Sequence, residues 1–316
     1  MAGGLLGRLL GPRTDPELAA LTAWAVDQVE PRLKQVGGFP QRYASAIAHA
    51  SAYCSDLASR VPGPIELNRQ AFAQTPLVHA LFGASDGIAQ ALVKSKAVRE
   101  WQRNASGQAD TYALMGVRRW TKDIFGMEDS NGMLRRDVAQ KAVYFADHTF
   151  SNLGTSLEDT RSQLARQFLS SLLARVKDRL DALGTDRHAL EQESDELRAR
   201  LRASPHDTGL QAALEKNLAA LRGAVAGLDL RSYARDFDAV LGAPEQYLGL
   251  RSLSMTLDAM GIQQPAGGEA ALQPLDFTEM ACRDRRRWIV MVVRCRLDEL
   301  PPYHERLAQE ERWLAI

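Results

Sequence analysis

The sequence predicts a predominantly helical α+β protein: an N-terminal helical bundle packed on a small antiparallel sheet with a long antiparallel coiled-coil hairpin inserted. Three observations predict this class. Apolar residues recur at helical spacing over the first hundred positions, two strand-like segments flank an Asn-Gly pair, and a heptad pattern separates them from later strands. We therefore expect a bundle at 1–108, a β region at 109–150 and 246–300, the hairpin at 153–243 and a C-terminal helix at 301–316.

Capping and breaking residues divide the first hundred positions into helices. Thr14 or Asp15 can cap a helix that has Pro16 in its first turn, and a second helix has apolar residues on one face from Tyr43 to Val61. The Pro-Gly-Pro sequence at 62–64 ends this second helix. Shorter helices are expected to start at Pro64, Thr75, Ser85 and Ser95.

The next two segments, 112–127 and 133–150, predict a β hairpin. They flank Asn131-Gly132, a pair that readily adopts the positive φ angles of a tight hairpin turn. We therefore expect two antiparallel strands. The spacing of Val138, Ala142 and Phe145 also fits a helix, so the second segment has two interpretations.

A heptad pattern follows. Apolar positions alternate steps of four and three from Val176 to Leu201, with Arg187 and Ser194 as polar interruptions, and the alternation returns beyond Leu214. Residues 202–209 break the pattern. Because two seams separated by a short break pair antiparallel, we expect a helical hairpin. Its first arm, of about 45 residues, would be roughly 65 to 70 Å long.

Strand periodicity returns after the hairpin. Residues 253–257 alternate apolar and polar side chains, and residues 275–282 form a further strand. In residues 288–297 one face is wholly apolar, and Trp288, Val290 and Val292 are apolar on the other face. A strand that is apolar on both faces needs cover on both, so we expect it at the centre of the sheet. Since the chain enters and leaves the helical hairpin at one end, the β segments on either side should join in one sheet, on which the N-terminal helices pack.

Composition narrows the class of protein. The 316 residues carry 39 basic and 39 acidic side chains, which excludes the global positive field of a dedicated nucleic-acid binder. The three cysteines, Cys54, Cys282 and Cys295, have no CxxC spacing and are typical of buried thiols in a reducing compartment. These features indicate a cytoplasmic protein, with any membrane contact confined to residues 1–11.

Residues 83–87 read Gly-Ala-Ser-Asp-Gly and match the G-x-S-x-G pattern of a serine hydrolase, with Ser85 as nucleophile and His148 as a remote base. That reading also requires a strand before the serine and an oxyanion loop, and neither is predicted. A helix that ends at Gly83 and a new one capped by Ser85 explain the same residues, and we favour this interpretation. The six histidines include no pair at metal-ligand spacing, so no metal or cofactor is predicted.

Arginine precedes tryptophan twice on expected strands, at 118–120 and 285–288. Basic side chains beside aromatic rings are what single-stranded nucleic acid would need. However, the segments 112–150 and 275–300 together contain 12 basic and 10 acidic residues, so their net charge is small. We therefore favour a soluble sheet edge over a nucleic-acid interface.

Two hypotheses of different classes remain. The first is a non-enzymatic scaffold or adaptor that binds a protein partner, or a second copy of itself, through the helical hairpin. Its expected contact is an apolar stripe on the first arm, of which part should pack on the body and part should meet a second copy: Phe168, Leu169, Leu172 and Leu173. Replacing Leu169 and Leu173 by glutamate should convert an oligomer to a monomer, provided that these two residues lie on the outer edge of the stripe. The alternative is a serine hydrolase that uses Ser85.

Overall fold

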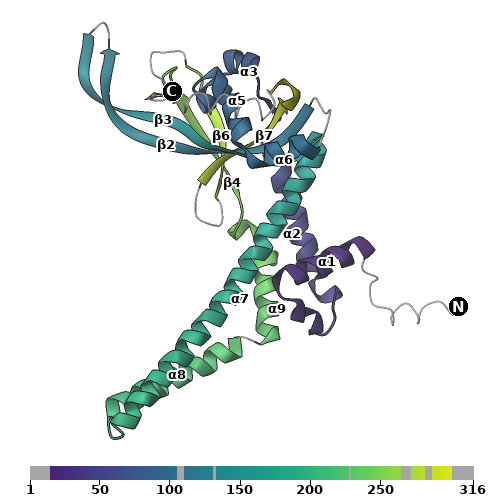
Figure 1. The fold of residues 1–316 in the computed structure, drawn as a ribbon, viewed down its shortest axis with the longest axis vertical. Helices are drawn as coiled ribbons and strands as arrows, with labels where there is room; N and C mark the ends of the chain where they lie inside the picture. Colours follow the sequence, from purple (N-terminus) through teal and green to yellow (C-terminus); the bar gives the residue numbers. More distant parts are fainter. Residues whose placement is uncertain are drawn as a thin grey trace, which may run out of the picture. The chain divides into compact units, whose positions relative to one another are not determined.

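The computed structural model describes residues 15–104, 110–130, 133–227, 229–264, 272–281 and 287–300 and has an α+β fold (Figure 1). The chain divides into two compact units. One, the helical unit, comprises Met1–Cys54 and Arg166–Tyr247, and the other, the sheet unit, comprises Ser55–Ala165 and Leu248–Ile316. This division passes through the expected bundle at 1–108 and through the base of the expected insertion at 153–243.

The helical unit is built around a long helix. Its elements are α1 (Pro16–Val29), η2 (Pro31–Gln35), most of α2 (Gln41–Ser59), most of α7 (Leu157–Ala203), α8 (Thr208–Gly227), α9 (Leu230–Gly242) and η3 (Pro244–Gln246). Asp15 caps α1 as expected, because its Oδ1 accepts a hydrogen bond from the Glu17 amide at 3.0 Å. In Figure 1, α8 runs back along α7 and α9 continues in the same direction.

The core of the helical unit joins segments that are far apart in the sequence. Tyr43 of α2 and Phe237 of α9 are both fully buried, and their rings meet edge to face with centroids 5.1 Å apart. The Tyr43 hydroxyl donates to the Leu33 carbonyl at 3.3 Å, while Arg179 of α7 forms an ion pair with Asp236 of α9 at 2.8 Å. The N-terminal helices and the base of the hairpin therefore share one core.

The sheet unit contains four short helices and seven strands among the residues that the structure describes. The helices are α3 (Arg69–Gln74), α4 (Pro76–Phe82), α5 (Ser85–Lys94) and α6 (Lys96–Asn104), with the turn η4 (Leu297–Glu299) near the end of the described chain. The strands are β1 (Ile65–Glu66), β2 (Asp110–Ser130), β3 (Met133–Gly154), β4 (Leu250–Leu257), β5 (Gln263–Gln264), β6 (Leu275–Ala281) and β7 (Arg287–Arg296). Their order is β3-β2-β7-β6-β4-β5 with antiparallel neighbours, and β1 pairs parallel to β7.

Strand β7 lies at the centre of the sheet, which confirms the prediction from its two apolar faces. Residues 289–293 are all buried. One edge of β7 pairs with β2 over residues 289–296, so β6 at residues 287–289 and β1 at residues 293–294 share the other edge. The β segments before and after the helical hairpin therefore form a single sheet, also as predicted.

The expectation that a helix starts at Pro64 is wrong. The residues after Pro64 form β1, because the backbone here pairs with the central strand: the Val292 amide donates to the Pro62 carbonyl at 2.7 Å. Gly63 permits this approach, since its φ is +122° and a Cβ atom would lie 2.1 Å from the Val292 oxygen. Helix α3 starts only at Arg69, after an Asn68 cap.

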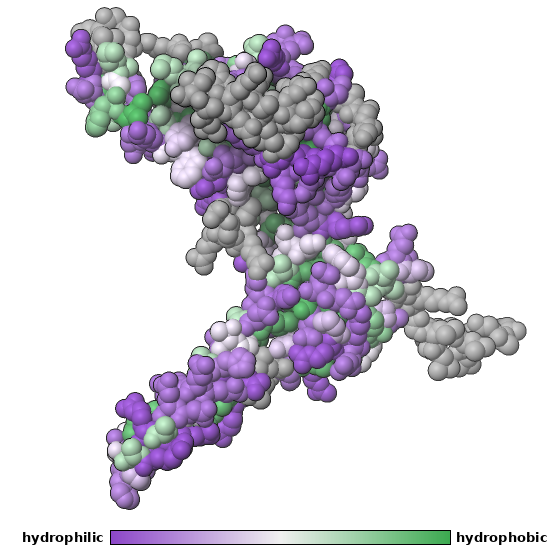
Figure 2. Space-filling model, in the orientation of Figure 1, coloured by the Kyte–Doolittle hydropathy of each residue, from purple (hydrophilic) through white to green (hydrophobic). Residues whose placement is uncertain are grey.

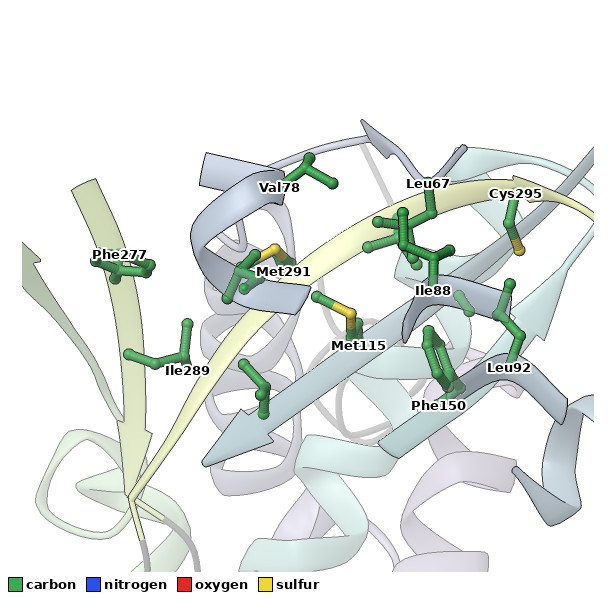
Figure 3. Close-up of a cluster of buried hydrophobic side chains, with 14 of the residues drawn as sticks. Leu67, Val78, Ile88, Leu92, Met115, Phe150, Phe277, Ile289, Met291 and Cys295 are labelled. Carbon is green, nitrogen blue, oxygen red and sulfur yellow. The ribbon is translucent and has the colours of Figure 1, made fainter. Parts of the chain in front are cut away.

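The core of the sheet unit lies between the sheet and the short helices (Figure 3). Val78 of α4 and Ile88 and Leu92 of α5 belong to one buried cluster with Met115 of β2 and Met291 of β7. Burying each of these side chains contributes roughly 1.5–3 kcal/mol to folding. The predicted packing of N-terminal helices on the sheet is thus confirmed for the segment from α4 to α6.

The β2–β3 hairpin is longer than the rest of the sheet. Both segments are strands, so the helical interpretation of the second segment is wrong, and Ser130 pairs with Met133 across the predicted turn. Beyond Val117, β2 leaves β7 and pairs with β3 alone; residues 118–146 are here called the β2–β3 extension. On the outer edge of β3, the Val143 amide donates to the Gly261 carbonyl at 2.8 Å.

Several expectations fall outside the described residues. These are the N-terminal residues 1–11, the turn pair Asn131-Gly132, the segment 282–286 with Cys282, and the C-terminal helix at 301–316. The other two cysteines are buried as expected, and burial raises the pKa of both the Cys54 and the Cys295 thiol to about 12.

Candidate functional sites

Ser85 is the first residue of a helix rather than its cap. Helix α4 ends at Gly83 in the left-handed conformation (φ +64°), as predicted, but the capping position of α5 is the extended residue Ala84. The expectation that Ser85 caps α5 is therefore wrong, because the extended residue before the helix is Ala84 and Ser85 already has helical backbone geometry. The side chain of Ser85 is exposed and makes no hydrogen bond to the first turn of the helix.

His148 of β3 has a structural partner. Its Nε2 lies 3.0 Å from the Leu81 carbonyl, and its ring stacks on Phe82 with centroids 4.6 Å apart. Burial lowers the pKa of His148, more than the Leu81 carbonyl and Asp147 raise it. Among the described residues no hydrogen bond joins His148 to Ser85, so the structure does not bring these two into a nucleophile–base pair. The described part of the chain also holds no cluster of three metal-ligating side chains.

The apolar stripe of the first arm is covered within the chain. Phe168, Leu169, Leu172 and Leu173 are each at most 3% exposed. The condition for the Leu169 and Leu173 test, that these two residues lie on the outer edge of the stripe, is therefore not met. The base of α7 belongs to the same compact unit as α1, α2 and α9, so the stripe is broader than a two-helix seam because more than one helix packs there.

Farther along the hairpin, α7 pairs with α8. We call residues 180–224 the distal arm. Its seam contains two buried polar residues, Ser194 of α7 and Asn217 of α8, and Asn217 Nδ2 donates to Glu193 Oε2 across the seam at 2.8 Å. Seven seam leucines are only half-buried: Leu183, Leu190, Leu201, Leu210, Leu214, Leu218 and Leu221. Two helices therefore leave the apolar seam partly open to solvent.

Charge is unevenly distributed along the distal arm. Residues 181–196 contain six carboxylates and one arginine, whereas residues 198–202 at the tip contain three arginines and no carboxylate. Arg187, predicted to interrupt the seam, pairs with Glu191 on the same helix at 2.7 Å. Figure 2 shows a mainly hydrophilic surface on this part of the molecule, with hydrophobic atoms between the hydrophilic ones.

The first arginine–tryptophan sequence lies beside a cavity in the sheet unit. This cavity, of about 220 Å³, is lined by Arg118, Arg119, Glu279, Arg287 and Ile289. It lies where β2 leaves β7, at the start of the β2–β3 extension. Sequence reasoning identified the arginines but not Glu279, because only the pairing of β6 with β7 brings that carboxylate to them.

Comparison with known proteins does not assign these sites. No family model matches the chain, and neither a curated protein nor a solved structure matches it. Among the helices that the structure describes, none has both the length and the apolar character needed to cross a membrane.

Proposed function

We propose that the protein is a non-enzymatic scaffold that associates through the distal arm of its helical hairpin, with a second copy of the chain as partner. One observation carries the proposal: the seven seam leucines stay half-buried although α7 and α8 already face each other. Helices from another protein that packed along the open seam would bury this apolar surface, as in a four-helix bundle.

The charge pattern supports self-association in one orientation. If two distal arms pack antiparallel, the three arginines near the tip of one arm lie along the acidic segment of the other. Parallel packing would instead place arginines beside arginines and carboxylates beside carboxylates. The hydrogen bond from buried Asn217 to Glu193 supports this reading, because a polar contact across an apolar seam fixes the register of the hairpin that the partner would meet.

Charge reversal tests the proposal without touching the seam. Replacing Arg198, Arg200 and Arg202 by glutamate should convert a dimer to a monomer in sedimentation equilibrium, because the tip would then repel the acidic segment. Replacing Asp181, Asp186, Asp195 and Glu196 by arginine should do the same, because residues 181–196 would then carry five arginines and two carboxylates. A mixture of the two variants should restore a heterodimer, since opposite charges again face each other.

A matched control carries three reversals elsewhere. Arg69, Arg103 and Arg166 are exposed, and their replacement by glutamate changes the net charge by the same amount without altering the distal arm. This control should dimerise like the wild type. Wild-type protein that stays monomeric at high micromolar concentration, or a reversed tip that dimerises as well as the wild type, would refute self-association through the distal arm.

A further inference from the structure

One side of α7 carries a stripe of charged residues near the tip of the distal arm. Glu191, Asp195, Arg198 and Arg202 follow one another at steps of four, three and four residues, so they share one face of the helix. We call these four residues the charged stripe. Each of them comes directly after a seam position of α7 (190, 194, 197 and 201), so the stripe runs along one side of the seam. Asp195, Arg198 and Arg202 are exposed, and Glu191 is half-buried.

The charges of the stripe are opposite at equal distances from its middle. This middle lies between residues 196 and 197: Asp195 and Arg198 are equally far from it, and so are Glu191 and Arg202. In an antiparallel pair of helices with a two-fold axis at this point, each residue of one copy meets the residue of the other copy that is equally far from the axis. Asp195 would then meet Arg198, and Glu191 would meet Arg202, twice in each dimer.

The other side of the seam lacks this symmetry. Positions 189, 193, 196 and 200, each directly before a seam position, hold alanine, two glutamates and arginine in that order. An antiparallel pair about their middle would set Glu193 against Glu196 and Ala189 against Arg200. Glu193 also accepts the hydrogen bond from Asn217 within its own arm. The charged stripe is therefore the side of α7 that complements itself.

We propose that two copies of the chain meet tip over tip through the charged stripe, with the two-fold axis between residues 196 and 197. This inference rests on the proposed self-association and specifies its register and contacts. Helix α7 ends at Ala203, so in this register residues 190–203 of the two copies overlap, over about 20 Å of helix. Asn217 bonds to Glu193, so residues 208–220 of α8 lie in the same part of the arm.

This overlap contains most of the apolar surface that the hairpin leaves open. Five of the seven half-buried seam leucines lie in it: Leu190, Leu201, Leu210, Leu214 and Leu218. A second arm along the stripe side would cover part of this surface while the stripe charges stay at its rim. Charged residues beside an apolar seam set partner choice and orientation in coiled coils in the same way.

The stripe charges would form a network around the axis. Within one arm, Asp195 and Arg198 lie 3.4 Å apart. In the dimer the two copies of this pair would surround the axis with four alternating charges, and such networks stabilise more than isolated exposed ion pairs do. An overlap of about 20 Å is short for a protein interface, so we expect a weak dimer that high salt dissociates.

Charge exchange between chains tests the register. Asp195→Arg and Arg198→Asp should each weaken the homodimer by roughly tenfold in sedimentation equilibrium, because both contacts next to the axis then join like charges. An equimolar mixture of the two variants should form a heterodimer about as stable as the wild-type dimer, since each contact again joins opposite charges. Within each chain of the mixture, positions 195 and 198 still carry like charges, so the rescue has to come from contacts between chains.

Two controls locate the axis. A mixture of Asp195→Arg and Arg202→Asp should not regain stability, because the arginine introduced at position 195 still meets Arg198 of the other copy. Glu17→Arg changes the net charge by as much as Asp195→Arg does and concerns an exposed residue of α1, outside the distal arm. This variant should dimerise like the wild type.

Different results overturn the inference and the proposed function. Suppose that the wild type dimerises and that reversing Arg198, Arg200 and Arg202 abolishes the dimer. If Arg198→Asp then fails to rescue Asp195→Arg, or if Arg202→Asp rescues it equally well, the axis lies elsewhere, and the proposed register is wrong while self-association stands. Wild-type protein that stays monomeric at high micromolar concentration refutes both.

Discussion

Phe237→Ala should destabilise the helical unit strongly. The Phe237 side chain is fully buried, and truncating such a residue typically costs about 3–5 kcal/mol through lost apolar contact and the cavity left behind. Its edge-to-face contact with Tyr43 accounts for about 0.5–1.5 kcal/mol of that loss. Since domains are stable by only about 5–15 kcal/mol, the variant should lose a large part of its helical structure at moderate denaturant concentration.

Urea unfolding followed by circular dichroism measures this loss, and hydrogen exchange locates it. Amides of α2 and α9 should exchange faster in the variant, while those of β7 should change little. A double-mutant cycle with Tyr43→Leu should return a coupling free energy of about 0.5–1.5 kcal/mol. Phe125→Ala is the matched control, because Phe125 is 79% exposed and its truncation should change stability by less than about 0.5 kcal/mol.

If Phe237→Ala lowered the free energy of unfolding by less than about 1 kcal/mol, the reasoning would be refuted, because removing a fully buried ring typically lowers it by about 3–5 kcal/mol. Equal acceleration of exchange in α9 and in β7 would refute the other part, namely that the core of residues 16–54 and 166–247 opens as a unit of its own.

Three further predictions concern single residues. Gly63→Ala should lower the free energy of unfolding, measured by urea titration, by about 2 kcal/mol or more, because the new Cβ would meet the Val292 oxygen. Gly83→Ala should lower it by only about 1 kcal/mol through backbone strain, because no atom lies within 4 Å of the new Cβ. Because the pKa of His148 is lowered in the folded protein, the unfolded chain binds the proton more readily. The free energy of unfolding should therefore fall as the pH drops below about 6.5. In urea titrations at a series of pH values, His148→Gln should make the free energy of unfolding depend less on pH in this range. Ser85→Ala should change stability by less than about 0.5 kcal/mol, since the hydroxyl makes no capping bond, and an esterase activity abolished by this change would contradict the scaffold proposal.

Features with a local signal could be predicted from the sequence. The two apolar faces of residues 289–293 identify a central strand wherever its neighbours come from, and Asn131-Gly132 identifies a hairpin because the turn and its strands are contiguous. The heptad spacing identifies α7 in the same way. In each case the residues that produce the pattern also form the element.

Features that depend on distant partners could not be predicted. Periodicity shows that Leu169 and Leu173 are apolar, but not that helices of the same chain cover them. Strand β1 has two residues, too few for any period, and depends on pairing with β7. Beside the cavity of the sheet unit, Asp147 has a φ of +58° at a shift in the strand register, and register decides which side chains face each other across the strands.

The position of β7 in the chain has a consequence for biosynthesis. A ribosome makes β1, β2, β3, β4 and β6 before it reaches residue 287, and only then does the strand appear that links β1, β2 and β6. Glu66 precedes Arg294, its ion-pair partner, by 228 residues in the chain. Until then the nascent sheet unit consists of separate hairpins with an uncovered apolar face, the kind of surface that chaperones bind. All residues of the helical unit have been synthesised by residue 247, so this unit can fold before the central strand β7 has been made.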